Sequence, residues 1–387
     1  MSLPNVGGYA GHGRYWGSGS VKRASVVAHI RHLCCLGLGA EAVMPALLKA
    51  LHDLVPSDSN AFFWVDQQDE ISNFCAERIL PTEVMRLYFR EFYDDPVGGF
   101  RCTLKRAAGN QHGIDSQTRA AGFYRSDYYN LVWREHLNAH HVMYAAVQEQ
   151  GRCLGQLSLY RSLREKSFAP EDETLLAQVT HYVAHAVASG AKCLGNHEEY
   201  FDTKRIGMLI LDAHGEPQHL SEEGKRLLFL ASYPAVSRQT LLGSENDPVP
   251  AALKQITQHL NAIFSGKDAP PPIWHIDNCW GRFAFRAFWL DAERGSDHGL
   301  IGVTVQQQEL LPLKLLGQLQ TLRLSDKQKH VILMLAEGAS YGQIADQLNI
   351  STNTANYHVK QIYERLNVHT RNDLLNKLIG NTTTRND

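Results

Sequence analysis

The sequence lacks the features that assign a chain to the secreted, disulfide-stabilised or membrane classes. Its seven cysteines are scattered and include no CxxC pair, which is typical of reduced thiols and gives no sign of a disulfide framework. No apolar run approaches the roughly 20 residues that span a bilayer, and the Gly-rich start has none of the order of a signal peptide. We therefore expect a cytoplasmic protein that does not insert into a membrane.

The chain also lacks an excess of charge and the common catalytic motifs. Lys plus Arg number 38 against 40 Asp plus Glu, a formal charge of −2, so any affinity for nucleic acid must be local. The motifs GxxxxGK[ST] and HExxH are absent, and we therefore expect no enzyme. His181 and His185 share one helix face without further ligands, and a haem on His219 has no support. No metal or cofactor is therefore expected.

With 387 residues the chain is longer than a domain with a single hydrophobic core usually is, so two or three units are expected. The pattern predicts a flexible N-terminus over 1–20, an α+β unit over 21–195 and a second over 200–308. A leucine-rich linker helix over 309–322 and a helical unit over 323–380 follow.

Both predicted α+β units combine short apolar strands with amphipathic helices. The first has a strand at AFFWV (Ala61 to Val65), a hairpin turning at Gly151, and a closing helix that begins near Pro170. The second opens with the strand and turn GMLILDAHG and ends with three strands, IWHIDNCW, GRFAFRAFWL and HGLIGVTVQ.

The last unit contains two helices separated by a sharp break. Asn349 stands at the break, where the left-handed conformation is needed, and Ser351 or Thr352 caps the second helix. In that helix an apolar stripe predicts the buried face: Ala355, Val359, Ile362 and Leu366. This is the pattern of a helix-turn-helix.

The opposite face of the second helix is polar and suits contact with DNA bases. It carries Thr352, Asn353, Asn356, Tyr357, Lys360 and Tyr363. Between Arg323 and Asp387 eight basic residues face six acidic ones, so phosphate affinity per subunit is modest. We therefore expect a homodimer that binds an operator with two half-sites, because the second subunit doubles the number of DNA contacts and so raises the affinity.

The run from Leu324 to Leu375 resembles the LuxR/FixJ-type DNA-binding domain, with LS..K....V..L..EG.S...IA..L.IS..T...H...I...L.V..R matching that family. The resemblance implies a four-helix module in which Asn356, Tyr357 and Lys360 reach base edges of double-stranded DNA. It also implies that Thr352, Thr354, His358 and Arg371 lie near the phosphates and that the helix over 371–379 pairs two subunits.

Two departures from that family stand out. Lys327, Gln328 and His330 stand where Arg-Glu-x-Glu is usual, and Ala355 with Asn356 replaces the usual Val-Lys. The second departure predicts a DNA reader that relies on hydrogen bonding more than on charge.

The preceding units resemble sensor domains that accompany such modules. SDYYNLVWREHLNAHHVMYAAV with FAPEDETLLAQV is similar to a GAF domain, and GMLILDAHGEPQHLSEEGKRLL to the start of a PAS domain, with Ser221 where Asn is common. The expected fold is therefore multidomain: two α+β sensor domains, GAF-like and PAS-like, and an all-α helix-turn-helix domain. A Trp/Tyr cluster followed by Asp95-Pro96 also faintly resembles receptors of acyl-homoserine lactones.

The GAF-like unit is the expected ligand site because of its aromatic residues, which supply apolar walls and orienting polar groups. The candidate ligand-binding residues are Trp64, Tyr93, Asp95, Tyr128, Tyr129, Trp133 and Tyr144. The implied effector is a small apolar or amphipathic molecule: an aromatic, terpenoid or steroid-like metabolite, or a lactone signal.

The sequence thus favours a ligand-responsive transcription factor that acts as a homodimer on a pseudo-palindromic operator. Family resemblance favours an activator, with RNA polymerase as a partner. Two alternatives remain: a module whose front domains bind a partner protein while the C-terminal helices only dimerise, and a receptor for a lactone-like signal.

Overall fold

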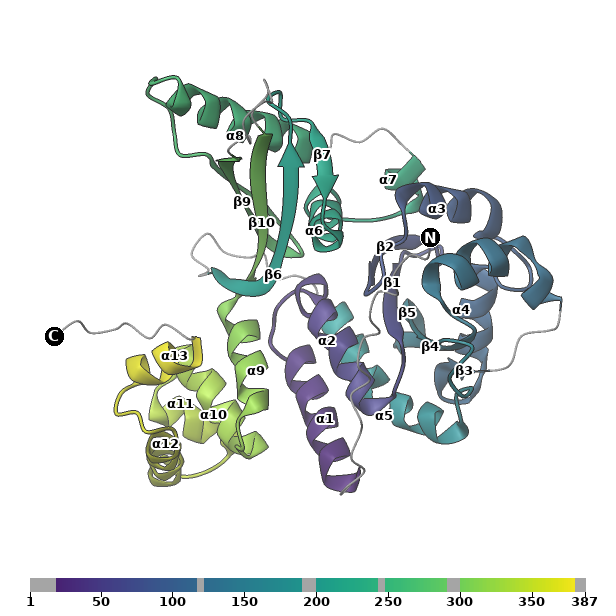
Figure 1. Cartoon of the computed structure of the whole chain (residues 1–387). Helices are drawn as coiled ribbons and strands as arrows, with labels where there is room; N and C mark the ends of the chain where they lie inside the picture. Colours follow the sequence, from purple (N-terminus) through teal and green to yellow (C-terminus); the bar gives the residue numbers. More distant parts are fainter. Residues whose placement is uncertain (1–18, 117–121, 190–199, 243–247, 291–299, 380–387) are drawn as a thin grey trace, which may run out of the picture.

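The computed structural model describes residues 19–116, 122–189, 200–242, 248–290 and 300–379 of the chain. Two sheet-containing units are followed by a group of helices, as Figure 1 shows. The predicted fold class, two α+β units followed by an all-α unit, is confirmed. The predicted flexible segment 1–20 lies outside the described residues except for its last two, Gly19 and Ser20, which begin a helix instead.

The first unit is built on a five-stranded antiparallel sheet in the order β2-β1-β5-β4-β3. Its strands are β1 (Ser59–Val65), β2 (Ile71–Ala76), β3 (Ile114–Asp115), β4 (His141–Glu149) and β5 (Arg152–Arg161). Gln150 and Gly151 both have positive φ, 50° and 80°, so the β4–β5 hairpin turns where the sequence predicts it.

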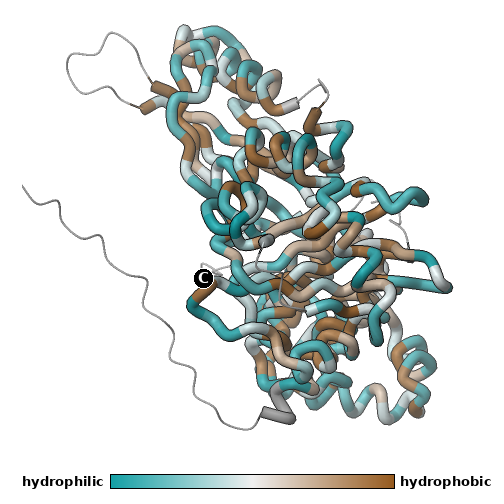
Figure 2. Tube along the Cα trace, turned by 90° about the vertical axis from the view of Figure 1, so that its right-hand side faces the viewer, coloured by the Kyte–Doolittle hydropathy of each residue, from teal (hydrophilic) through white to brown (hydrophobic). Residues whose placement is uncertain are grey.

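Helices cover both faces of this sheet. One face packs against α1 (Gly19–Cys34), α2 (Ala40–Leu54) and α5 (Pro170–Ala188). The other carries α3 (Thr82–Leu87), η1 (Tyr88–Phe92), α4 (Phe100–Gly109), η2 (Gln111–Gly113), η3 (Phe123–Arg125) and η4 (Tyr129–Leu137). Strand residues are therefore buried on both sides, and the apolar stretches follow the strands in Figure 2.

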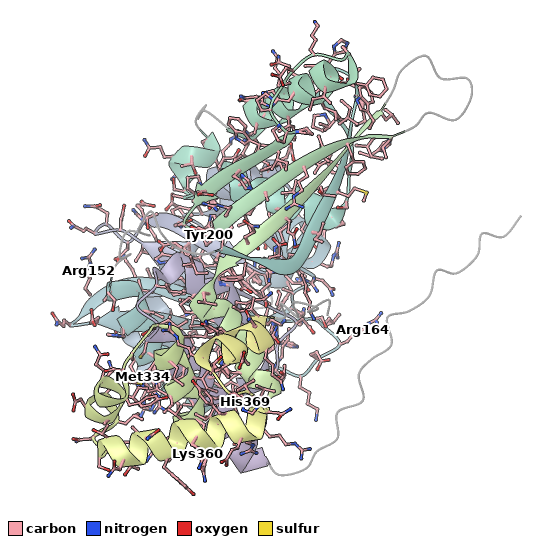
Figure 3. All side chains as sticks on the ribbon, turned by 90° about the vertical axis from the view of Figure 1, so that its left-hand side faces the viewer. Arg152, Arg164, Tyr200, Met334, Lys360 and His369 are labelled. Atoms are coloured by element: carbon pink, nitrogen blue, oxygen red, sulfur yellow. The ribbon has the colours of Figure 1, made fainter. Side chains whose placement is uncertain are left out.

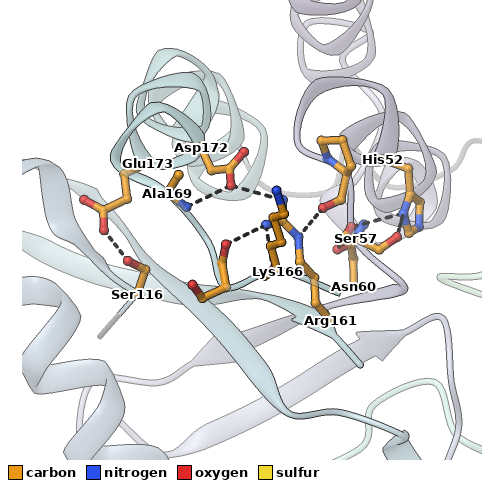
Figure 4. A network of polar contacts seen from close by, with 11 residues as sticks. His52, Ser57, Asn60, Ser116, Arg161, Lys166, Ala169, Asp172 and Glu173 are labelled. Carbon is orange, nitrogen blue, oxygen red and sulfur yellow. Dashed lines mark hydrogen bonds and ion pairs between the residues drawn. The ribbon is translucent and has the colours of Figure 1, made fainter. Parts of the chain in front are cut away.

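A polar network fastens the first set of helices to the sheet (Figure 4). Arg161 on β5 pairs with Asp172 on α5, Nη2 to Oδ2 3.1 Å, and its Nε donates to the Pro56 carbonyl at 2.8 Å. His52 on α2 donates through Nε2 to Glu77 at 2.7 Å. These bonds fix the ends of α2 and α5 over the sheet.

The second unit repeats the strand order of the first. Its sheet runs β7-β6-β10-β9-β8, which is the order 2-1-5-4-3 in both units. The strands are β6 (Tyr200–Leu211), β7 (Pro217–Leu220), β8 (Ile273–Asn278), β9 (Gly281–Leu290) and β10 (Leu300–Leu310), so the three late strands are confirmed. The helices α6 (Glu222–Ser232), α7 (Arg238–Leu242) and α8 (Pro248–Phe264) complete it.

The α6–α7 region of the second unit reaches across to the first unit. The amide of Val236 donates to Asn73 Oδ1 on β2 at 2.8 Å, and Arg86 Nε on α3 donates to the Leu241 carbonyl at 2.9 Å. Val236 and Leu241 are fully buried in this contact. We call the segment from Val236 to Leu242 the clasp.

The C-terminal unit follows directly from the second sheet. Its helices are α9 (Leu311–Thr321), α10 (Asp326–Ala336), α11 (Tyr341–Leu348), α12 (Thr352–Leu366) and α13 (Arg371–Ile379). α9 begins at the residue after β10 ends and packs on both α10 and α13. No helix among the described residues has the length and apolar character needed to cross a membrane.

Candidate nucleic-acid interface and effector cavity

Local sequence signals fix the break between α11 and α12. Ser340 and Gln343 form a capping box that starts α11. Asn349 ends it in the left-handed conformation with φ 55°, and Ser351 Oγ then caps α12 by accepting from the Thr354 amide at 3.1 Å. The predicted turn residue and N-cap are therefore confirmed.

The two faces of α12 differ as its sequence predicts. Ala355, Val359, Ile362 and Leu366 are buried against α10 and α11. The opposite face is exposed to solvent and carries Thr352, Asn353, Thr354, Asn356, Tyr357 and Lys360, with His358 half-buried at its side. In Figure 3, α12 with Lys360 lies at the lower edge of the molecule.

Some of the predicted DNA-contacting residues have intramolecular hydrogen bonds, and the hydroxyl of Thr354 lies 2.8 Å from that of Ser351. Tyr357, 59% exposed, accepts a hydrogen bond at its hydroxyl from Gln361 Nε2 at 2.6 Å, one turn further along α12. Arg371 begins α13 and donates from Nη2 to the Ala336 carbonyl at 2.9 Å, at the end of α10. Arg371 thus lies off the α12 face, and its role at the phosphates stays a prediction.

A cavity lies in the first unit between the sheet and the η1, α4 and η4 helices. Its volume is about 80 Å³. Among its lining residues are Ser59, Ala61, Phe63, Phe74, Arg78, Met85, Tyr88, Phe89, Thr103, Tyr128, Val132, Trp133, Leu137, Tyr144, Gln156, Ser158 and Tyr160.

Two walls of the cavity are π-helical. η1 contributes Tyr88 and Phe89, and η4 contributes Val132, Trp133 and Leu137. π-Helices are rare and occur mainly as single turns at functional sites. Two of them around one cavity are independent support for a binding site there.

The cavity remains uncharged on its aromatic side. Burial raises the pKa of the Tyr88, Tyr144 and Tyr160 hydroxyls above their ordinary value, and the neighbouring tyrosines add to the effect at Tyr88 and Tyr160. These side chains are therefore neutral hydrogen-bonding groups at any physiological pH.

Of the predicted ligand residues, Tyr128, Trp133 and Tyr144 line the cavity and the other four do not. Trp64 lies on the face of β1 that is turned away from the cavity, where it packs edge-on against Phe62 and Trp280. Its neighbour Phe63 lies on the other face and lines the cavity.

Local contacts also explain why the other three predicted residues, Tyr93, Asp95 and Tyr129, do not line the cavity. Tyr93 stacks on Phe100 behind the wall, and its hydroxyl accepts from the Ile71 amide at 3.0 Å. Asp95 Oδ1 accepts from the Gly98 amide at 2.7 Å and shapes a turn. Tyr129 bonds through its hydroxyl to His140 Nδ1 at 2.7 Å and points away.

The sequence analysis missed the polar lining residues Thr103, Gln156 and Ser158. The run QLSLY on β5 carried a signal, because Gln156, Ser158 and Tyr160 alternate with leucines that face α2 and α5. A strand in which polar and leucine residues alternate, and both kinds are buried, is covered by helices on both of its faces.

Comparison with known proteins identifies the C-terminal unit. Residues 322–378 match the family model of bacterial regulatory proteins, luxR family. This confirms the predicted helix-turn-helix family for that part of the chain. No curated protein sequence matches the chain.

Solved structures add two distant likenesses. The GAF domain of a phosphoenolpyruvate-protein phosphotransferase from Coxiella burnetii is 15% identical, covers 44% of this chain and 95% of its own, and has a TM-score of 0.34. A ligand and DNA complex of VqmA from Vibrio cholera is 12% identical, covers 46% of this chain and 85% of its own, with a TM-score of 0.21. At such low scores, what the two sheet units do has to be argued from their own residues.

Proposed function

We propose that this chain, whose residues 322–378 form a luxR-family regulatory domain, is a ligand-responsive transcription factor that binds a pseudo-palindromic operator as a homodimer. A small effector occupies the cavity of the first unit. The regulator acts in the cytoplasm as an activator that works with RNA polymerase.

The observation that carries the proposal is the solvent-exposed polar face of α12. Asn356 and Tyr357 can donate to and accept from base edges, and Lys360 adds a positive charge one turn further on. The helix N-terminus, capped by Ser351, directs backbone N–H groups outward for a phosphate. A helix used only for packing has no need of such an exposed polar face.

Dimerisation follows from the small local charge. An excess of two basic residues supports few phosphate contacts, so one subunit binds DNA weakly. Two linked domains on half-sites about 34 Å apart multiply their affinities. Ligand binding then controls the regulator by favouring arrangements in which both α12 helices reach adjacent major grooves.

The alternative of a lactone-type receptor loses its support in the first unit. Asp95 caps a turn and does not line the cavity, so it is not available to a ligand there. A volume of about 80 Å³ also leaves no room for an acyl chain attached to a ring.

Gel shifts of the full chain on candidate operators test the DNA-binding function. Binding that is specific and falls steeply between about 50 and about 200 mM salt supports it. Absence of binding at the lower salt concentration contradicts it, and favours instead a module that binds a partner protein and uses its last helices to dimerise.

Lys360→Ala tests the role of α12 itself. Loss of one base or phosphate contact costs about 1–3 kcal/mol of binding free energy per subunit, which weakens operator binding roughly tenfold or more. Because Lys360 is exposed, the melting temperature of the protein should not change. The matched control is Lys267→Ala, which removes the same charge from an exposed site in the second unit. Equal operator affinity in both variants would show that α12 does not dock as proposed.

A further inference from the structure

The size of the cavity limits what can enter it. Its volume of about 80 Å³ lies below the roughly 150 Å³ of an engineered apolar cavity that accommodates benzene. The walls on the helical side include two π-helical segments, a rare conformation found mainly at functional sites. A single ring is therefore the upper limit for an occupant.

The lining that the structure describes offers no negative charge to a cation. Among the described residues that line the cavity, none is a carboxylate, and the tyrosine hydroxyls remain protonated. Arg78 is the one charged lining residue, and its Nη1 donates to the Leu137 carbonyl at 2.7 Å, which ties β2 to the end of η4. Arg78 thus acts as a brace between two walls.

One end of the cavity carries hydrogen-bonding capacity that the protein uses poorly. Gln156, 1% exposed, bonds through Nε2 to Ser158 Oγ at 3.3 Å, and its Oε1 accepts from Thr103 Oγ1 at 3.5 Å. Ordinary donor–acceptor distances are about 2.7–3.2 Å for N–H···O bonds and about 2.5–3.0 Å for O–H···O bonds. A buried amide with four hydrogen-bonding sites and two long bonds is set for a further partner.

Aromatic rings form another part of the cavity wall. Tyr128 and Trp133 lie edge to face at 6.2 Å between ring centroids, and Trp133 meets Tyr160 at 6.0 Å in the same manner. Such edges and faces suit a flat apolar surface. The lining of the cavity thus combines aromatic rings with a buried amide.

We propose that the effector of this regulator is a small, flat, uncharged molecule, at most one six-membered ring, whose polar substituent hydrogen-bonds to the Gln156 amide. Phenols and heteroaromatic rings with one hydroxyl or carbonyl group belong to this class. The inference rests on the proposed effector site in the first unit, and it replaces the wider range of terpenoid, steroid-like and lactone molecules that the sequence leaves open.

Calorimetric titration of the full chain with small probes tests the class. Phenol, toluene and N-methylpyridinium have nearly the same shape and differ in polarity and charge, benzoate adds a negative charge, and 1-naphthol adds a second ring. Phenol is expected to bind about tenfold more tightly than toluene, by the value of one hydrogen bond to a buried amide. The two ions and 1-naphthol are expected to give no heat at concentrations that saturate with phenol.

Each other outcome overturns a stated part of the proposal. Toluene binding as tightly as phenol removes the role of Gln156, and binding of either ion removes the requirement for a neutral molecule. Binding of 1-naphthol removes the size limit. Failure of phenol to bind overturns the proposed class as a whole.

Gln156→Leu identifies the amide as the group that selects the probe. This variant keeps the volume and removes the hydrogen bonds, so it is expected to bind toluene at least as well as phenol. Gln307→Leu is the matched control, because Gln307 is a buried glutamine of the second unit that bonds to the Trp280 carbonyl at 2.8 Å. Ser158→Ala is the milder variant if Gln156→Leu does not fold, and it too is expected to reduce the preference for phenol.

The ligand-binding and the DNA-binding experiments test the two proposals independently, so either proposal can be contradicted without the other. Phenol binding without operator binding at low salt would leave the ligand class standing and contradict the proposed function. Operator binding without phenol binding would do the reverse.

Discussion

Filling the cavity of the first unit should stabilise the protein and abolish its response to an effector. Ala61 on β1 lines the cavity and is 3% exposed, so Ala61→Leu places its additional carbon atoms in empty space. At about 24 cal/mol per Å³, filling about 80 Å³ contributes about 2 kcal/mol. Burial of the new carbon atoms at about 0.8 kcal/mol each acts in the same direction.

The opposite face of the same sheet offers a matched control. Ala145 on β4 is fully buried against the helical layer formed by α1, α2 and α5, and it does not line the cavity. Ala145→Leu therefore overfills a packed region and should cost about 1–3 kcal/mol. The two variants are the same substitution on two faces of one sheet.

Urea unfolding followed by tryptophan fluorescence measures both variants, with phenol titration and operator binding recorded on the same samples. Ala61→Leu should unfold at higher urea than the unmodified chain, bind no phenol and retain its operator affinity. Unfolding of Ala61→Leu at urea concentrations as low as those for Ala145→Leu would refute the cavity and the ligand site built on it.

Two further predictions concern other contacts of the first unit. The hydrogen bond that His52 donates to Glu77 raises the pKa of His52 above its ordinary value, so the stability from this pair is complete below about pH 6.5 and is lost as pH rises through the raised pKa. The melting temperatures of His52→Gln and the unmodified chain should accordingly differ at about pH 6 and converge at about pH 9, and a constant difference would mean that the charge has no part in it. In the clasp, Asn73→Ala leaves the buried Val236 amide without its partner at a cost of about 1–3 kcal/mol. Phenol should then still bind while its effect on operator affinity falls, whereas Asn261→Ala, which loses only a bond inside the second unit, should leave that effect intact.

The helix-turn-helix was predictable because its signals are local. A cap at Ser351, a left-handed residue at Asn349 and a stripe from Ala355 to Leu366 each depend on neighbours within a few residues. The face of α12 that must stay polar follows from the face that must be buried. Fold and orientation therefore agree with the sequence at this end of the chain.

The cavity was less predictable because β1 is covered on both sides. Both Phe63, which is half-buried, and Trp64, which is buried, are aromatic residues of this strand, and the helices packed outside them decide that Phe63 faces the cavity. The π-helical path of η1 and η4 depends on tertiary packing, so no periodicity in the sequence reveals it. Of the six predicted aromatic residues, three therefore line the cavity, and the sequence analysis did not single out the Gln156 amide.

The direct junction of β10 and α9 makes the C-terminal unit an extension of the second sheet. β10 is hydrogen-bonded to β6 on one side and β9 on the other, and α9 starts at Leu311 with no intervening loop. An α-helix of this length is about 16 Å long, so a tilt of about 10° at its base displaces its far end by about 3 Å. In a dimer both ends move, and half-sites about 34 Å apart tolerate little of this. In the proposed dimer, a small rotation of β10 would therefore shift the two α12 helices relative to the half-sites.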